Sequence, residues 1–167
     1  MLPQSTRRVV VGVDGTPRTV AALRWAAAEA LLRDAELHAV HAWGSGMRPA
    51  SHAPFAEHAT PDECARRAAA CLTETVSAAF GASPPVPVRE VVDDRSVVPA
   101  LLYHSRDAEL LVLATRVPGG PGGPPGESGP GSTTLSCLRQ GACPVVVLPT
   151  VSDRIAPAPA AADAAIR

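Results

Sequence analysis

Short apolar runs alternate with longer amphipathic stretches at the start of the chain. Residues 8–13 carry a continuous apolar run that ends at Asp14, a pattern typical of a strand buried on both faces. Residues 17–33 begin with a proline suited to a helix start and place apolar side chains at helical spacing. Residues 37–42 form a second apolar run. This segment therefore predicts a βαβ unit with parallel strands and a right-handed crossover.

The same alternation continues to residue 150. We expect helices at residues 60–80, 96–105 and 132–140, and strands at residues 88–92, 109–114 and 144–148. Strands that alternate with helices predict an α/β doubly wound sheet of five mainly parallel strands, a Rossmann-like three-layer sandwich. The Gly- and Pro-rich run at 119–131 predicts no regular structure. Residues 1–150 form the expected domain, and the Ala- and Pro-rich residues 151–167 are expected to be a disordered tail.

Length and charge narrow the classes of function. With 167 residues, one domain is expected, and 15 basic against 16 acidic side chains argue against a nucleic-acid binder. All the basic residues are arginines. The absence of lysine excludes a Walker phosphate loop, a protein kinase and a Schiff-base enzyme. No apolar run is long enough to span a membrane and no signal peptide is recognised, so we expect a cytoplasmic protein that does not bind membranes.

Candidate catalytic and metal-binding chemistry is sparse. The four cysteines, Cys64, Cys71, Cys137 and Cys143, form no Cys-x-x-Cys pair and are expected to be reduced and buried. The histidines show no ligand spacing, so no metal site is predicted. Asp93-Asp94 without a lysine does not make a receiver domain, and no nucleophile elbow is present. The sequence predicts no catalytic residues.

A ligand site is expected beyond the carboxyl ends of the strands. In doubly wound sheets, ligands bind at that edge where the strand order reverses. The segments that reach it are the turn at Asp14, the strand ends near Val40 and Ala114, and the Gly-rich run before the last helix. A shared site requires the Asp14 turn to face the start of that helix.

Three segments resemble the universal stress protein family. They read VVGVDGTP at residues 10–17, LHAVHAW at 37–43 and CPVVVLP at 143–149, with Gly131-Ser132 before the last helix. The resemblance covers about residues 7–150. It implies the strand order 3-2-1-4-5, cytoplasmic homodimers and, in one branch of the family, ATP as the cofactor with at most slow hydrolysis.

The resemblance also assigns candidate nucleotide contacts. The ATP-binding branch carries Gly-x-x-Gly, nine further residues, and then Gly-Ser or Gly-Thr. In this chain Ala114 and Val117 stand in place of the first two glycines, 13 residues separate Val117 from Gly131, and only Gly131-Ser132 is retained. The contacts that the resemblance predicts are Gly12, Val13, Asp14, Val40, Ala114, Gly131, Ser132 and Thr133.

Each of these assignments has an alternative. Asp14 is also suited to cap the first helix as a turn residue, and Val40 to fill the strand core. Val117 does not readily take the backbone conformation of a phosphate-loop glycine, although the start of the following helix still favours an anion. The hypotheses are therefore an ATP-binding stress-response module, a dimeric interaction module that binds no nucleotide, and a module for another small anion or metabolite.

The composition of the last strand indicates a second kind of contact, between protein chains. Residues 144–149 are strongly apolar and form an edge strand in the implied topology. In the family that the chain resembles, this strand pairs across a two-fold axis, so the resemblance implies a homodimer with an isologous interface. The alternative is an edge covered by a helix or the tail of the same chain.

Overall fold

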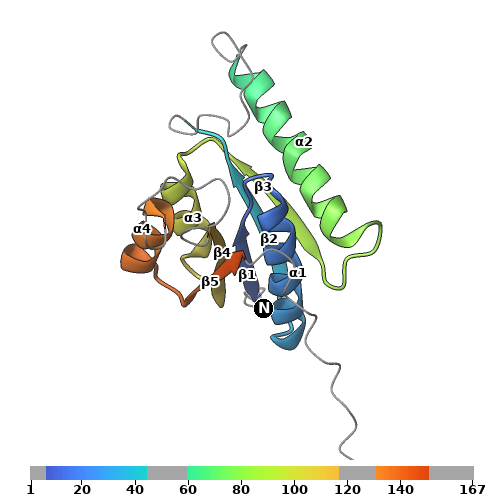
Figure 1. Cartoon of the computed structure of the whole chain (residues 1–167), viewed down its shortest axis with the longest axis vertical. Coiled ribbons are helices and arrows are strands. Elements are labelled where there is room, and N and C mark those ends of the chain that lie inside the picture. Colours follow the sequence, from blue (N-terminus) through green and yellow to red (C-terminus); the bar gives the residue numbers. More distant parts are fainter. Residues whose placement is uncertain (1–6, 45–59, 117–130, 151–167) are drawn as a thin grey trace, which may run out of the picture.

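The computed structural model describes residues 7–44, 60–116 and 131–150, and nine regular elements lie within these ranges. They are β1 (Arg8–Gly12), α1 (Pro17–Leu32), β2 (Glu36–Ala42), α2 (Pro61–Phe80), β3 (Val88–Asp93), α3 (Val97–Ser105), β4 (Leu110–Arg116), α4 (Ser132–Gln140) and β5 (Val145–Thr150). The strands form one sheet in the order β3-β2-β1-β4-β5 (Figure 1), and each neighbouring pair is parallel. The predicted fold class and strand order are confirmed.

The ends of several elements differ from the expected ones by one or two residues. The largest differences are at the ends of β4 and β5, which each run two residues further than expected because Thr115 and Arg116 pair with Pro149 and Thr150. A strand end is set by its partner strand as well as by its own residues. Of the irregular run expected at 119–131, residues 119–130 lie outside the described residues, as does the expected tail at 151–167.

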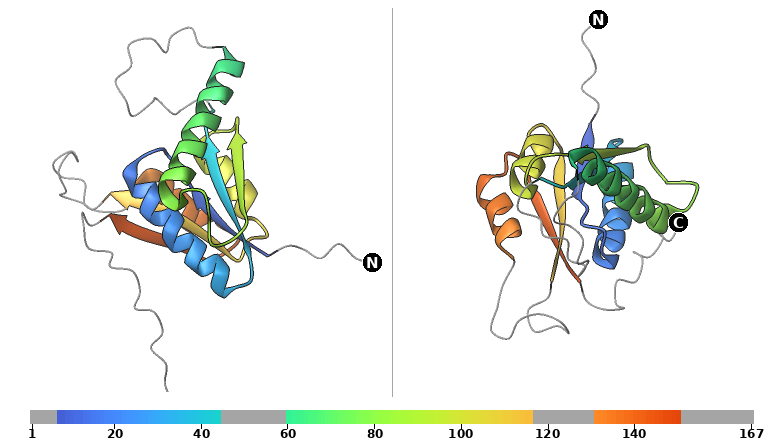
Figure 2. Two further views of the ribbon diagram at one scale, coloured as in Figure 1. Left: turned by 90° about the vertical axis from the view of Figure 1, so that its right-hand side faces the viewer. Right: turned by 90° about the horizontal axis from the view of Figure 1, so that it is seen from above.

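Helices cover both faces of the sheet and make three layers. Seen from above, α1 and α2 lie on one side of the strands and α3 and α4 on the other (Figure 2). Alternate residues of β1 divide between the two layers, since Val9 and Val11 pack towards α1 and α2 while Val10 joins the cluster with Leu101 of α3. This burial on both faces explains the unbroken apolar runs of the central strands.

The face under α1 is filled mainly by small side chains. Ala22, Ala26, Ala27 and Ala30 are buried around Leu23, whose side chain is fully enclosed. Alanine at these positions lets the helix lie close to the sheet, which suits a chain with only 3% aromatic residues. The C-terminal end of α2 is held to α1 by Arg24, whose Nε and Nη2 donate to the carbonyls of Ala79 and Ala78 at 2.9 and 3.1 Å.

A buried carboxylate connects the end of β3 to α3. Asp93, 6% exposed, accepts hydrogen bonds from the backbone N–H and a guanidinium nitrogen of Arg95, both at 2.8 Å, and from Nε2 of His104 at 2.7 Å. Burial alone would raise the pKa of Asp93, but these hydrogen bonds and the Arg95 charge hold it below its ordinary value. Because α3 forms part of the wall of a cavity at the carboxyl ends of the strands, this contact helps to position that wall.

No helix within residues 7–44, 60–116 and 131–150 is both long enough and apolar enough to cross a membrane.

Candidate functional site

A cavity of about 260 Å³ opens at the carboxyl ends of β1, β2 and β4. Its walls come from the strand ends and from the first turns of three helices. The lining residues are Gly12, Val13, Asp14, Thr19, Val40, Ala42, Val97, Leu101, Leu113, Ala114, Thr133 and Thr134. The cavity therefore lies where ligands bind in doubly wound sheets, at the point where the strand order reverses.

The cavity brings together most of the residues that the sequence singled out. Gly12, Val13, Asp14, Val40, Ala114 and Thr133 line it, so the turn after β1 does face the start of α4. Gly131 and Ser132 do not line it, and both are exposed at the beginning of α4. The last helix thus reaches the cavity with its second and third residues rather than with the Gly-Ser pair.

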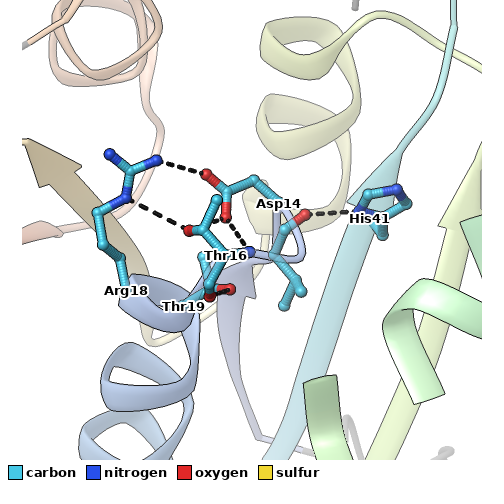
Figure 3. A network of polar contacts seen from close by, with 6 residues as sticks. Asp14, Thr16, Arg18, Thr19 and His41 are labelled. Carbon is cyan, nitrogen blue, oxygen red and sulfur yellow. Dashed lines mark hydrogen bonds and ion pairs between the residues drawn. The ribbon is translucent and has the colours of Figure 1, made fainter. Parts of the chain in front are cut away.

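The carboxylate of Asp14 is engaged by its own turn. One oxygen accepts hydrogen bonds from the backbone N–H of Thr16, at 2.9 Å, and from the Thr16 hydroxyl, and the other pairs with Nη2 of Arg18 at 3.2 Å. Figure 3 shows the carboxylate between Thr16 and Arg18. The side chain of Asp14 thus fixes the turn into α1, as the turn role predicts, and the residue also lines the cavity, while its contact with a nucleotide stays a prediction.

A buried histidine fixes the other side of this turn. The main-chain carbonyl of Val13 accepts a 2.8 Å hydrogen bond from Nδ1 of His41, which is 5% exposed (Figure 3). The N–H of Val13 in turn donates to the carbonyl of Val40 at 2.8 Å. The backbone between β1 and the Asp14 turn is therefore held by hydrogen bonds to β2 on both sides.

The absence of a side chain at Gly12 brings the strand close to two leucines. A Cβ there would lie 3.1 Å from Cδ2 of Leu101 and 3.2 Å from Cδ2 of Leu113, and all three residues line the cavity. A larger residue at this position would push the leucines aside or fill part of the cavity. Gly12 thus has a steric role that its place in the strand run did not reveal.

The three helices that begin at the cavity have uncapped first turns. The N-cap residues of α1, α3 and α4 are Thr16, Ser96 and Gly131, and none accepts a side-chain capping bond from its helix. By contrast, α2 starts elsewhere and carries a complete capping box between Thr60 and Glu63. Prolines remove one early N–H from α1 and one from α3, whereas the first turn of α4 has none. The start of α4 is therefore the richest source of unpaired donors.

Part of the polar lining was not predicted from the sequence. Thr19 and Thr134, the third residues of α1 and α4, both line the cavity and are buried. Serine and threonine near a helix start were visible in the sequence, but which of them turns inward depends on how the helix packs. The remaining unpredicted lining is apolar, from β2, α3 and β4.

The other titratable groups do not form a catalytic or metal-binding cluster. Within the described ranges no group of three or more His, Cys, Asp or Glu side chains is placed to hold a metal ion. Burial raises the pKa of the Cys137 and Cys143 thiols, so both are poor nucleophiles at neutral pH. In the described part of the cavity wall, Asp14 is the only charged residue, and Arg18 balances its charge.

Comparison with known proteins identifies a family. Residues 5–149 match the model of the universal stress protein family. Universal stress protein Rv2623 of Mycobacterium tuberculosis is 31% identical over 147 residues, which is 86% of this chain and 48% of that protein. Universal stress protein Mb2019 of Mycobacterium bovis is 33% identical over 155 residues, which is 90% of this chain and 46% of that protein. The chain spans about half the length of these curated relatives.

Solved structures with the same fold include nucleotide complexes. A universal stress protein in complex with cAMP aligns with a TM-score of 0.58 at 20% identity, over 87% of this chain and 98% of that chain. The universal stress protein from Archaeoglobus fulgidus in complex with dAMP aligns with a TM-score of 0.51 at 18% identity, over 84% of this chain and 96% of that chain. These likenesses concern the fold alone. Because the family model matches most of its length, the chain belongs to the universal stress protein family.

Proposed function

We propose that this chain is a cytoplasmic stress-response module that binds a nucleotide, with ATP as the first candidate, in the cavity between the Asp14 turn and the start of α4. The observation that carries the proposal is the meeting of apolar strand ends with uncapped helix starts around one cavity. Apolar walls with a few convergent polar groups are typical of small-molecule sites.

The two kinds of wall suit the two parts of a nucleotide. Val40, Val97 and Leu113 provide an apolar surface for a flat base. The unpaired N–H groups in the first turn of α4, together with the positive end of its dipole, favour a phosphate. Neighbours of the same fold that hold cAMP and dAMP support this choice of ligand class. The described residues form no catalytic constellation. A bound nucleotide would therefore bring negative charge into the cavity and act as the signal.

One observation favours the alternative of an interaction module without a nucleotide. Ala114 lines the cavity where the resemblance expects the first loop glycine, and its methyl group restricts how closely the backbone can approach a phosphate. The proposal therefore relies on α4 rather than on the segment after β4 for phosphate binding.

Calorimetric titration of the purified chain with ATP, AMP and cAMP tests the proposal. We expect saturable binding of at least one of them with a stoichiometry near one per chain. Gly12→Val serves as the blocking variant, because its side chain would occupy the space between Leu101 and Leu113 at the cavity wall. Loss of binding in a variant that still melts cooperatively would locate the site. No saturable heat from the wild-type chain with any of the three nucleotides would overturn the proposal.

We further propose that β5 pairs with a second copy of this chain to form a homodimer. β5 is an edge strand, and the α4 helix that contacts it exposes Leu135 and Leu138, at 39% and 47%. An apolar edge beside exposed leucines favours self-association unless something covers it. The family resemblance of residues 143–149 points to the same strand.

Sedimentation velocity of the wild-type chain decides whether it is a dimer. Leu138→Glu places a charge on the exposed surface of α4, the helix that contacts β5, and is expected to shift the equilibrium to monomer. Leu32→Glu is the matched control, because Leu32 is 79% exposed but lies at the end of α1, which packs against the opposite face of the sheet. A wild-type chain that sediments as a monomer at all concentrations tested would refute the dimer.

A further inference from the structure

Thr134 is unlike every other buried polar side chain in the described part of the molecule. It is 5% exposed, lines the cavity, and makes no side-chain hydrogen bond. The other buried hydroxyls all have partners: Thr19 donates to the carbonyl of Thr16 at 2.8 Å, Thr75 to that of Cys71 at 2.7 Å, and Ser105 to that of Leu102 at 3.5 Å. Buried polar groups are normally paired, so an exception needs a physical reason.

Thr134 lines the cavity, and its hydroxyl is not fully enclosed by the protein. No fully enclosed side-chain oxygen or nitrogen in the described residues lacks a partner. The unpaired hydroxyl of Thr134 therefore retains some accessible surface, and because Thr134 lines the cavity we infer that this surface faces it. On folding, a hydroxyl in this position loses most of its hydration and gains no hydrogen bond within the protein. This loss lowers the stability of the folded chain.

The backbone around Thr134 supplies further donors of the same kind. Thr134 is the third residue of α4, whose N-cap Gly131 has no side chain to accept from the first turn. The first N–H of α4 with an observed helical partner is that of Leu135, which donates to the carbonyl of Gly131 at 3.0 Å. A donor hydroxyl beside unpaired N–H groups at a helix start is complementary to an anionic oxygen.

The corresponding residue of α1 cannot take this role in the same way. Thr19 is also third in its helix and also lines the cavity, but its hydroxyl already donates to Thr16. The carboxylate of Asp14 is likewise engaged, by Thr16 and Arg18. Thr133 also lines the cavity but is only half-buried, so Thr134 is the buried residue of the described cavity wall whose hydroxyl has no partner.

We propose that Thr134 is a specificity-determining residue of the site: its hydroxyl donates a hydrogen bond to a phosphate oxygen of the ligand and so favours phosphorylated ligands over the corresponding nucleosides. The inference rests on the proposed function and adds to it the residue that distinguishes a nucleotide from a nucleoside.

The test compares AMP with adenosine, which differ only by the phosphate, on three variants of the whole chain. Thr134→Val keeps the shape of the side chain and removes the hydroxyl, and Thr134→Ser restores it. Thr75→Val is the matched control, because Thr75 is equally buried, at 6% exposure, but lies on α2 across the sheet and has a partner for its hydroxyl. Calorimetry gives the affinities, and thermal melting without ligand gives the stabilities.

We expect Thr134→Val to weaken AMP binding about tenfold or more, the size of one charge-assisted hydrogen bond, and to leave adenosine binding unchanged. Thr134→Ser should retain wild-type affinity for AMP. Without ligand, Thr134→Val should melt no lower than wild type because it removes an unpaired hydroxyl, whereas Thr75→Val should melt lower and keep its affinity for AMP.

Two results would overturn the inference while the proposed function stands. One is AMP binding by Thr134→Val at wild-type affinity. The other is an equal loss for AMP and adenosine, which would mean that the hydroxyl does not contact the phosphate. If wild-type chain binds none of AMP, cAMP and ATP, the proposed function fails and this assignment fails with it.

Discussion

Gly15, in the turn after β1, lies directly against the thiol of Cys71 on α2. A Cβ at position 15 would collide with Sγ of Cys71, and the backbone of Gly15 has a φ of 77°, in the region that favours glycine. The turn that leads into α1 therefore packs closely against α2, which lies on the same face of the sheet as α1. Residues 15 and 71 are distant in sequence, so only the fold reveals why glycine follows Asp14.

We predict that Gly15→Ala destabilises the chain by more than its conformational cost alone. Placing alanine in left-handed backbone costs about 1–2 kcal/mol, and the collision with Cys71 adds to it. Gly81→Ala is the control, because Gly81 has a φ of 63° but a Cβ there would meet no atom within 4 Å. Urea unfolding measures both variants. Equal losses for the two would show that the Cys71 contact is unimportant, and Cys71→Ala should recover part of the loss specific to Gly15→Ala.

The Asp14 turn predicts different outcomes for two substitutions. In Asp14→Asn the amide oxygen can still accept from the N–H of Thr16 and keep the turn, whereas Asp14→Ala removes that acceptor. We therefore expect nucleotide affinity to fall clearly more in Asp14→Ala than in Asp14→Asn, as measured by calorimetry with the nucleotide that wild type binds best. Equal losses in both variants would indicate that the negative charge itself contacts the ligand.

The architecture was largely predictable from the sequence, while part of the site was not. Apolar runs such as residues 8–13 are typical of strands buried on both faces, and their alternation with helices limits the topology. In α4 the relation between polarity and burial is inverted at three positions, because Thr134 is buried while Leu135 and Leu138 are exposed. Hydrophobic periodicity assigns the leucines to the core and so conceals Thr134.

The site residues that were predicted share a different property. Asp14 follows the end of β1 and Ala114 lies in the last half of β4, and the carboxyl ends of parallel strands lie along one edge of the sheet. Their convergence therefore depends on strand order alone. The side-chain partners of Asp14, by contrast, depend on the rotamers of Thr16 and Arg18, which no sequence pattern fixes.

The hydrogen bonds of Arg24 to α2 lie away from the cavity, and we predict that their loss lowers the free energy of unfolding. Its guanidinium donates to two carbonyls at the C-terminal end of α2, where the helix leaves acceptors unpaired. Arg24→Ala should lower the free energy of unfolding by about 1–3 kcal/mol, the range for hydrogen bonds from a charged donor, and should leave nucleotide affinity unchanged. Arg67→Ala, at an exposed position of α2, is the control and should change stability by less than about 0.5 kcal/mol. Similar losses in the two variants would argue against the capping role.

The lowered pKa of Asp93 leads us to predict how the free energy of unfolding changes as the pH falls. Its pKa is held below the ordinary value by Arg95 and His104 despite burial, so the folded chain favours the ionised carboxylate more than the unfolded chain does. The unfolded state therefore binds more protons as the pH falls towards about 4, the ordinary pKa of aspartate. The contribution of Asp93 is fully present above that pH and is lost as the pH falls through the lower pKa of the folded state. Asp93→Asn should thus be clearly less stable than wild type at pH 7.

The difference between wild type and Asp93→Asn should shrink below about pH 4, because protonated Asp93 resembles the amide. Urea unfolding at steps from neutral pH to about pH 3 measures this. Glu109→Gln is the comparison: the pKa of Glu109 is also lowered, by the hydrogen bond and charge of Arg7, but this pair is at the surface, where solvent screens it. Its effect on stability should be small at every pH. A constant difference between wild type and Asp93→Asn across the range would mean that the ionised carboxylate does not stabilise the connection between β3 and α3.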